Sequence, residues 1–312
     1  MPSVSVTTGQ LFNPVLTNIA RQYRPTGFVA DAVCPRVTVN RESGQYVIYG
    51  ASDFFRNDVD ALKPDRSPSK EIDLGISTAT FVAQEYAFKA SISRRELANT
   101  DLANLRQDKV NLVMDQLALA REVRVATKLR KTTTGDLTSG AAPSNNWNVD
   151  AGTIEVDTIT AKDAIYDLIG RGANAAVIPF KVAEQVAVQQ DIREVLKYTV
   201  NGQQILSQGE GILPAQLWGL KIHVPEGRRA SNAEGAAASF ADVWGDEVRV
   251  LYVNPNASYG APSVAYTFQT RPVEVRSWQG DDPQVEYVEA SEIVVEVVTA
   301  PDAGYEIQDL LS

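Results

Sequence analysis

An alternation of apolar with small or charged residues from Ile72 to Ile92 constrains this chain more than any other pattern. The even positions carry most of the apolar side chains, with Phe81 as the exception among the odd ones. A period of two places one apolar face on an extended chain. At about 3.3 Å per residue an unbroken strand of this length would reach roughly 65 Å. Such an arm must bend or be covered by another molecule.

The residues before this alternation complete the picture of a hairpin. The sequence QYVIY at 45–49 is typical of a strand. The segment 56–71 that follows is polar and contains Pro64 and Pro68, which favours an exposed loop. We therefore expect a long hairpin with a polar tip, whose apolar face one subunit cannot cover along its whole length.

The segment from Asp101 to Lys131 predicts one long helix without Gly or Pro. Asp101 is placed as an N-cap, and Gly135 follows the end of the helix. A stripe at helical spacing contains Leu102, Leu105, Leu112, Val113, Leu117, Ala120 and Val123. The opposite side contains Met114, Ala118, Val125 and Leu129. A helix that is apolar on two faces should be covered from both sides.

The remaining segments predict a mixed α and β chain. Residues 1–44 are interrupted by Pro25, Gly27 and Pro35, and they favour an extended arm. A helix capped by Thr160, a strand at 174–180, a helix at 181–198 and strands at 219–227 and 246–253 suggest one α+β or α/β unit over about 155–262. The Gly- and Ala-rich segment 228–239 predicts a mobile surface loop. Four strands are expected at 264–268, 271–278, 284–289 and 292–298.

Few residues suggest chemistry. One cysteine, Cys34, and one histidine, His223, exclude an internal disulfide and the usual zinc sites. Ser67 and Lys70 match the S-x-x-K pattern of serine acyl enzymes, but that chemistry needs the two on a helix, and here they lie in a Pro-rich loop. We keep this reading as a remote alternative. We expect no catalytic residues, no metal and no cofactor.

Charge and hydropathy exclude other classes. Residues 1–135 carry 18 Lys and Arg against 14 Asp and Glu, whereas residues 136–312 carry 11 against 25. An acidic second half argues against a broad nucleic-acid footprint there, because phosphate binding requires clustered cations. No apolar run approaches the roughly 18 residues that span a membrane, and the first residues do not resemble a signal peptide.

The order of these parts resembles the major capsid proteins of tailed bacteriophages, which have the Hong Kong 97-type fold. Three stretches carry the resemblance: TNIARQYRPTGFVADAVCPRVTVNRESGQYVIYG at 17–50, ISRRELANTDLANLRQDKVNLVMDQLALAREVRVATKLRKTTTG at 92–135, and AGYEIQDLL at 303–311. They resemble the arm that leads into the hairpin, the strand and spine helix, and the usual ending of the family. The ordered set covers nearly the whole chain.

The resemblance implies an α+β fold with four parts: an N-terminal arm at 1–44, an E-loop hairpin at 45–86, a peripheral domain at 87–154 and 263–312, and an axial domain at 155–262. It implies a structural protein that is not an enzyme. Pentamers and hexamers of it would form an icosahedral shell in the virion, assembled in the host bacterial cytoplasm. The shell would enclose phage DNA without sequence-specific binding and without a membrane.

The resemblance also implies partners and contacts. Separate scaffolding, portal and decoration proteins are expected partners, and Lys63 and Lys70 are the hairpin lysines that a covalent Lys–Asn cross-link would use. An encapsulin-type nanocompartment shell, which has the same fold, is the alternative function. The candidate intersubunit contacts, taken from the alternating segment and the second face of the long helix, are Ile72, Leu74, Ile76, Val82, Tyr86, Met114, Val125 and Leu129.

Overall fold

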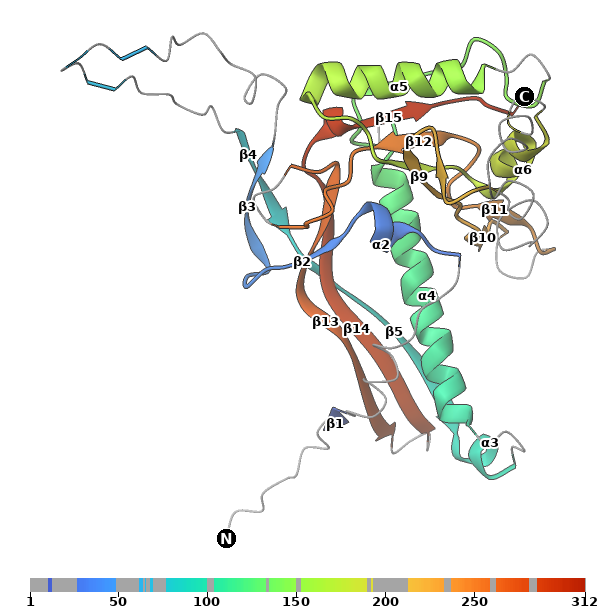
Figure 1. Ribbon diagram of the computed structural model, residues 1–312. Helices are drawn as coiled ribbons and strands as arrows, with labels where there is room; N and C mark the ends of the chain where they lie inside the picture. The colour runs from blue at the N-terminus through green and yellow to red at the C-terminus, as the bar shows by residue number, and fades with distance from the viewer. Residues whose placement is uncertain are drawn as a thin grey trace.

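The structure is a computed structural model of the 312-residue chain. It describes residues 11–12, 27–48, 62–63, 65, 68–69, 77–99, 104–132, 135–149, 153–189, 192, 213–232, 237–258, 262–280 and 285–311. Two sheets dominate the described part: a long sheet that runs down the molecule, and a six-stranded sheet at its upper end (Figure 1). The predicted helix at 181–198 begins as α6 (Phe180–Val188), and most of its second half lies outside the described residues.

The long sheet is built mainly from the last part of the chain. Strand β13 (Ala265–Gly280) pairs antiparallel with β14 (Val285–Val298), and β14 pairs antiparallel with β5 (Gln84–Ser93). Strands β1 (Leu11–Phe12) and β2 (Arg36–Thr38) both pair with β13, β2 in parallel. The sequence predicted four strands between 264 and 298, and the structure has two continuous ones, β13 and β14. Pro272 interrupts the pattern, but a register shift between Arg271 and Glu274 accommodates it.

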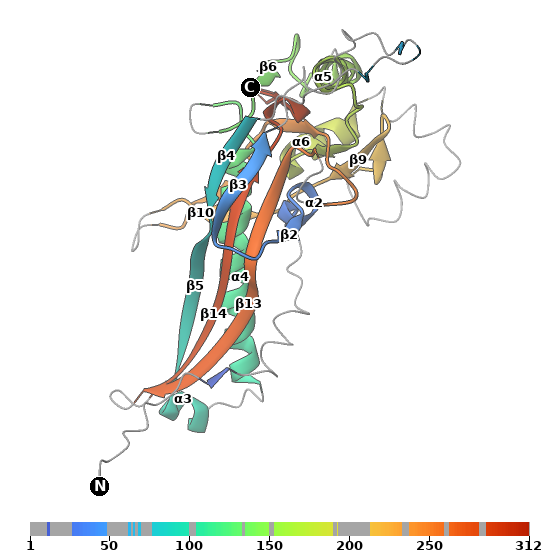
Figure 2. The ribbon, with the colours of Figure 1, turned by 90° about the vertical axis from the view of Figure 1, so that its left-hand side faces the viewer.

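Helix α4 (Leu105–Lys128) lies along one face of the long sheet (Figures 1 and 2). Val110, Val113 and Met114 pack against Ile92, Val275, Val288 and Ala290. The helix ends three residues before the predicted Lys131, because the Lys128 carbonyl accepts a hydrogen bond from the Asp136 backbone N–H at 2.9 Å. Leu112, predicted to lie in the apolar stripe, is 51% exposed.

The six-stranded sheet has the order β6 (Ser139–Ala141), β15 (Gly304–Ile307), β12 (Val248–Leu251), β7 (Ala175–Val177), β9 (Leu220–His223) and β8 (Gln216–Leu217). Helix α5 (Ile154–Ile169) lies across its upper side in Figure 1. The predicted division assigns β6 and β15 to the peripheral domain, yet both pair within this sheet. Burial of Ile307 and Leu310 in the core beneath α5 explains that position.

Helix α5 also begins earlier than predicted. Thr160 is not its N-cap: the hydroxyl donates a hydrogen bond to the Val156 carbonyl at 2.9 Å, inside the helix. The first turn is held instead near Asp157, whose carboxylate accepts hydrogen bonds from the Thr153 hydroxyl and the indole N–H of Trp147. Gly170, at φ 60°, ends the helix in the left-handed conformation that glycine favours.

The alternating segment forms two strands instead of one. Strand β4 (Ser77–Val82) pairs with β3 (Ser43–Ile48), and the chain then crosses at Ala83 to β5 in the long sheet. In β5 the predicted apolar face lies on the even positions, and its residues Ile92 and Ala90 pack on α4. In β4 the phase is reversed, because Phe81 is buried and Val82 is 62% exposed. Because the chain changes its partner strand at Ala83, the covered side chains are at odd positions before it and at even positions after it.

The segment predicted as a mobile loop at 228–239 begins with the first strand of a hairpin. Strand β10 (Arg228–Ala230) pairs antiparallel with β11 (Phe240–Asp242) in a sheet of two strands. Shorter elements complete the described part: α2 (Ala30–Val33), α3 (Arg94–Asn99) and the 3-10 helix η2 (Pro301–Ala303). None of the helices in the described residues is long and apolar enough to cross a membrane.

Candidate assembly interface

The described residues form no cluster of His, Cys, Asp or Glu that could hold a metal ion. Cys34 is buried, its sulfur lies 3.3 Å from the Thr267 hydroxyl, and burial raises the pKa of the thiol to about 12. His223 lies on β9, where burial and the neighbouring Lys221 lower the pKa of its imidazole. Ser67 and Lys70 lie outside the described residues. The function must therefore be sought in the surfaces of the subunit: those that are buried within the chain and those that stay exposed.

One face of α4 is buried within the chain where the arm crosses the helix. Glu122 of α4 is fully buried, and its carboxylate accepts hydrogen bonds from the backbone N–H groups of Val29 at 3.0 Å and Ala30 at 2.8 Å. A third hydrogen bond, at 2.6 Å, comes from the indole N–H of Trp244. Burial raises the pKa of Glu122, and the three hydrogen bonds oppose that rise. One carboxylate thus joins the arm, the long helix and the segment before β12.

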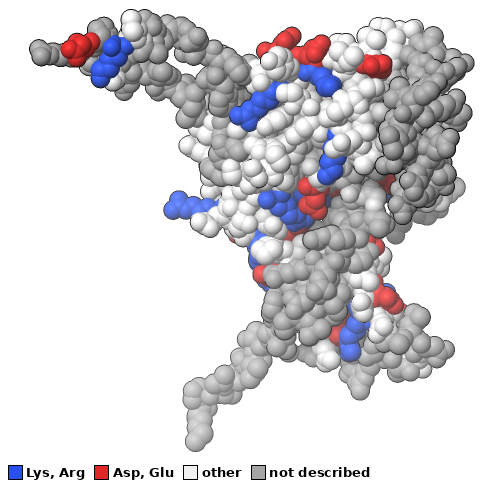
Figure 3. All heavy atoms as spheres, in the orientation of Figure 1, with Lys and Arg blue, Asp and Glu red and all other residues white. Residues whose placement is uncertain are grey.

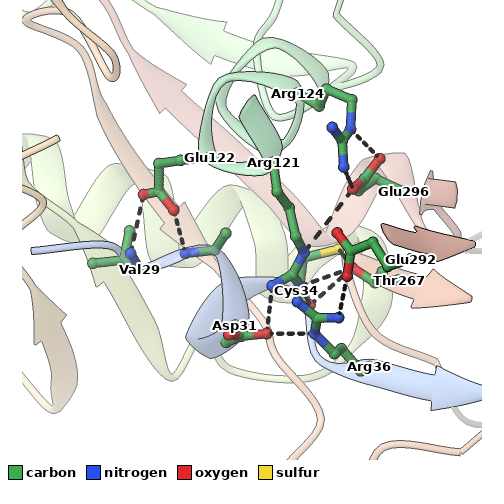
Figure 4. A network of polar contacts seen from close by, with 11 residues as sticks. Val29, Asp31, Cys34, Arg36, Arg121, Glu122, Arg124, Thr267, Glu292 and Glu296 are labelled. Atoms are coloured by element: carbon green, nitrogen blue, oxygen red, sulfur yellow. Dashed lines mark hydrogen bonds and ion pairs between the residues drawn. The ribbon is translucent and has the colours of Figure 1, made fainter. Parts of the chain in front are cut away.

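Arg121 makes the second set of contacts at this crossing (Figure 4). Its guanidinium is almost fully buried and pairs with Asp31, and it donates to the Cys34 carbonyl at 3.1 Å and the Thr267 hydroxyl at 3.0 Å. Burial acts to raise the pKa of Asp31, but Arg121 and Arg36 outweigh it and hold the pKa below its usual value. We call the contacts of Arg121 and Glu122 with residues 29–36 the arm clamp.

Two further ion pairs continue the clamp into β14. Arg36 donates to Glu292 at 2.8 Å, and Arg124 binds Glu296 through two hydrogen bonds of 2.8 and 3.0 Å. Figure 4 shows these groups converging from the arm, α4 and the long sheet. Paired and hydrogen-bonded charges of this kind are costly to break, because removing one partner leaves the other buried and alone.

A second buried network fixes the end of α4 to the six-stranded sheet. Arg249 of β12 is fully buried and donates to the Leu129 carbonyl at 2.7 Å, close to the end of α4. Its guanidinium lies 3.3 Å from the Glu306 carboxylate of β15. Burial lowers the pKa of Arg249 to about 10, against the opposing effect of Glu306 and Glu247. The two sheets are therefore connected through α4.

The hairpin formed by β3 and β4 is anchored on the long sheet by aromatic packing. Phe81 packs on Phe268 of β13 with ring centroids 4.9 Å apart, and Tyr46 lies 6.1 Å from the same ring. Next to this anchor, Val82 is 62% exposed, and Leu62, farther along the hairpin, is 71% exposed. The hairpin is thus anchored by aromatic packing, and Val82 beside the anchor is exposed.

The predicted contact residues divide into three groups. Val82 is exposed, and Tyr86 is half-buried under the guanidinium of Arg124, which lies 3.7 Å from its ring centroid. Ile72, Leu74 and Ile76 lie outside the described residues. The prediction is wrong for the three residues on the second face of α4, because each packs in a core within the chain: Met114, Val125 and Leu129.

For Val125 and Leu129 the reason for this error is that the arm packs on this face of α4, whereas Met114 packs against the long sheet. The second face of α4 was expected to wait for a neighbour, but residues 29–34, Leu137 and Trp244 already cover it around Val125. The clamp residues Arg121 and Glu122 were missed, because a charged pair in a helix is typical of a solvated face. A sequence signal was nevertheless present: the pair lies between apolar residues of both faces, where an ordinary solvated pair would not lie.

Comparisons with known proteins agree with this architecture. No family model matches the sequence. The chain is 24% identical to the major capsid protein of Burkholderia phage BcepMu over 310 residues, which cover 96% of this chain and 97% of that protein.

Solved structures give the same result. A phage-related protein from Bordetella bronchiseptica RB50 has a TM-score of 0.74 and 25% identity, covering 97% of this chain and 98% of that one. The capsid of cyanophage P-SCSP1u has a TM-score of 0.59 and 13% identity, with 98% and 92% covered. The chain therefore has the Hong Kong 97-type fold, and over nearly its whole length it is similar to the tailed-bacteriophage major capsid protein family, as the sequence predicted.

Proposed function

We propose that this chain is a major capsid protein that assembles into the icosahedral shell of a tailed phage. The observation that carries the proposal is the combination of full-length similarity to a phage major capsid protein with the Hong Kong 97-type fold. In this proposal, pentamers and hexamers of one chain close the shell, and the shell encloses phage DNA without sequence-specific binding. The protein acts by covering surfaces of its own copies, and no step of its work requires a catalytic group.

The proposed parts follow the predicted division, with residues 1–44 as the arm, 45–86 as the E-loop, 155–262 as the axial domain and the remainder as the peripheral domain. The E-loop would lie on a neighbouring subunit. Its exposed apolar residues support this, since a two-stranded hairpin is marginal in water without further cover. Of the predicted contacts we retain the hairpin residues Ile72, Leu74, Ile76, Val82 and Tyr86. To these we add Leu112, which is exposed on α4.

An encapsulin-type shell around a protein cargo is the alternative function. The sequence similarity to a phage major capsid protein favours the phage shell, because it spans nearly both chains. The remaining partners belong to the same proposal: separate scaffolding, portal and decoration proteins, assembly in the host bacterial cytoplasm, and a place in the capsid of the virion. A serine acyl enzyme that uses Ser67 and Lys70 stays a remote alternative, for which no described contact argues.

Electron microscopy of the purified chain tests the proposal. We expect closed shells, or rings of five and six subunits that close into shells on concentration. A protein that remains a monomer of 33.9 kDa across salt and pH would contradict it. Nuclease-protected DNA in particles from an infected host separates the phage shell from the nanocompartment, which would contain protein cargo instead. Hydrolysis of an activated ester that disappears in Ser67→Ala would favour the acyl enzyme.

A further inference from the structure

Strand β5 leaves one edge of the long sheet open. It pairs with β14 along its whole length, from Gln84 to Ser93, and with no other strand of the described residues. Figure 2 shows β5 as the outer strand on its side of the sheet. A free edge presents a row of backbone N–H and C=O groups to which another strand can be added.

This edge lacks most of the features that protect free edges. Folded proteins protect a free edge by keeping it short, or by bulges, prolines or charged side chains. Strand β5 is ten residues long, contains no proline and pairs with β14 without a register shift. Phe88 in its middle is 44% exposed, and Ala87 beside it is exposed as well. The charged side chains of the strand are Glu85 and Lys89, so their arrangement decides what can pair with this edge.

The two charges lie on the same face of the sheet. Side chains alternate between the two faces along a strand. Ile92 packs on α4, and the ring of Tyr86 lies 3.7 Å from the guanidinium carbon of Arg124, so the even positions are on the α4 side. The odd positions, which include Glu85 and Lys89, are on the other side.

Contacts within the chain leave both charged groups available at the edge. Glu85 pairs with Arg271 through one carboxylate oxygen, and its side chain is still 51% exposed. Lys89 is opposite Glu289 in the register of the sheet, and its ammonium lies 5.2 Å above the ring of Tyr287. Lys89 is exposed, and a cation over a ring keeps its N–H donors for other partners.

The geometry of a shell restricts how two such edges can meet. Every copy turns the same face inward, so a two-fold axis between two copies runs through the shell wall and not along it. Two β5 strands around this axis are antiparallel, and side chains of one face meet side chains of the same face. Odd positions are therefore opposite odd positions, and the pairing must be centred on a residue.

Of these registers, the one centred on Ala87 matches the strand to itself. Glu85 is then opposite Lys89 on one face, and Tyr86 is opposite Phe88 on the α4 side. Each pair occurs twice because the contact is symmetric. Cross-strand pairs of opposite charge and pairs of aromatic rings both stabilise antiparallel strands. Ala87 meets its own copy on the axis, where a small side chain permits close approach.

We propose that the β5 strands of two copies pair antiparallel across a two-fold axis of the shell, with Glu85 of each copy opposite Lys89 of the other. The inference rests on the proposed shell function, and it assigns a contact between neighbouring rings, which a closed shell needs besides the contacts within a ring. The occupant is a second copy because the edge is complementary to its own sequence. Figure 3 shows cations and carboxylates interspersed over the described surface of that view, so a contact between copies matches single residues and not large charged patches.

A cysteine placed on the axis tests the register directly. In Ala87→Cys the two new thiols face each other at the Cα separation of an antiparallel pair, about 4.5–5.5 Å, which is within the range of a disulfide. Oxidised glutathione should therefore convert most subunits of the assembled particles into covalent dimers on a non-reducing gel. The native Cys34 is buried and should not form a second link.

Ser91→Cys is the matched control for this cross-link. Ser91 is exposed on the same face of β5 but lies outside the overlap of residues 84–90, so it should give few dimers. Particles of Ala87→Cys without dimers, or equal amounts of dimer from both proteins, would overturn the proposed register.

Exchanging the two charges tests what they contribute to assembly. Glu85→Lys alone brings lysines together, and Lys89→Glu alone brings carboxylates together, so each should lower the yield of closed shells at least roughly tenfold while rings still form. The protein with both changes restores opposite charges at the same two-fold contact and should regain a yield within about twofold of the parent. Arg95→Glu, at an exposed cation beyond β5, controls for the change in net charge of Lys89→Glu.

Electron microscopy gives the shell yield, and the melting temperature shows whether each protein is folded. Single variants with the parent yield would overturn the contact, as would a double variant that keeps the parent melting temperature but forms no shells. In both cases the parent shells would still support the proposed function. A parent that forms neither rings nor shells contradicts that function, and the contact fails with it. If the charge variants do not fold, the cysteine pair decides, because Ala87 and Ser91 are exposed.

Discussion

Residues 29–36, which contain helix α2, and the β3–β4 hairpin both pack on the body of the subunit, but they are held in different ways. Residues 29–36 are held by buried charges, and Glu122 alone satisfies three N–H donors. The hairpin is held by aromatic packing at Phe81 and leaves Val82 and Leu62 exposed. Buried, paired charges hold the arm in one geometry on α4. Exposed apolar surface is typical of a site that another molecule covers. In the proposed shell, the buried charges would stabilise the subunit and the exposed hairpin residues would join it to a neighbour.

Removing the outer hairpin tests this separation most strongly. We expect deletion of residues 51–75, closed by a short turn, to abolish shell formation while the subunit still folds, because β3, β4 and the Phe81 packing remain. Particle yield by electron microscopy and the melting temperature measure the two effects. Shells of normal size from the deleted protein would show that the hairpin is not an assembly element, and loss of folded protein would place it in the subunit core.

Removing the carboxylate of the clamp should damage the subunit instead. Glu122→Ala leaves the N–H groups of Val29, Ala30 and Trp244 without their acceptor in a buried site. At about 1–3 kcal/mol for each of the three unsatisfied groups, we expect the free energy of unfolding to fall by at least roughly 3 kcal/mol. Urea denaturation measures it, and Asp108→Ala at an exposed carboxylate of the same helix is the control. A loss no larger than the control would mean that the clamp is dispensable.

A matched leucine pair on α4 distinguishes the two kinds of surface within one helix. Leu117 is 2% exposed and Leu112 is 51% exposed. Leu117→Ala should lower the free energy of unfolding by about 2–5 kcal/mol, whereas Leu112→Ala should change it by less than about 0.5 kcal/mol. Leu112→Ala should instead reduce particle yield, since we propose that a neighbour covers this residue. Equal effects of the two changes on stability would contradict the assignment.

The acid side of the stability curve gives the smallest effect. The pKa of Asp31 is lowered in the folded chain, so its contribution to stability is present above the ordinary value of 3.8 and is lost as the pH falls below it. Asp31→Asn should therefore flatten the pH dependence of the melting temperature below about pH 4 and leave it parallel to the parent near pH 7. An unchanged acid slope would indicate that Arg121 and Arg36 do not act on Asp31 as the geometry implies.

Features that depend on local periodicity could be predicted from the sequence, and features that depend on distant residues could not. The long helix, the strand phase in β5 and the order of the parts follow from local periodicity, and the structure contains them. The clamp was not predictable in this way, because Glu122 meets residues 92 and 93 positions earlier and Trp244 lies 122 positions later. The β10–β11 hairpin was missed since its connecting residues are Gly- and Ala-rich and resemble a mobile loop. Val125 and Leu129 are buried by the arm and Trp244, and Met114 is buried against β13 and β14, which also lie far along the chain.

The strand order of the long sheet determines how late during synthesis the sheet can form. Strands β1, β2 and β5 all reach the sheet through β13 or β14, which are residues 265–298 of a chain of 312. None of these early strands can find its partner until the last part of the chain has left the ribosome, and contacts of such high sequence separation form slowly. A chain truncated before residue 265 has no long sheet at all. We therefore expect truncated chains to be left out of an assembly, so that it contains full-length subunits.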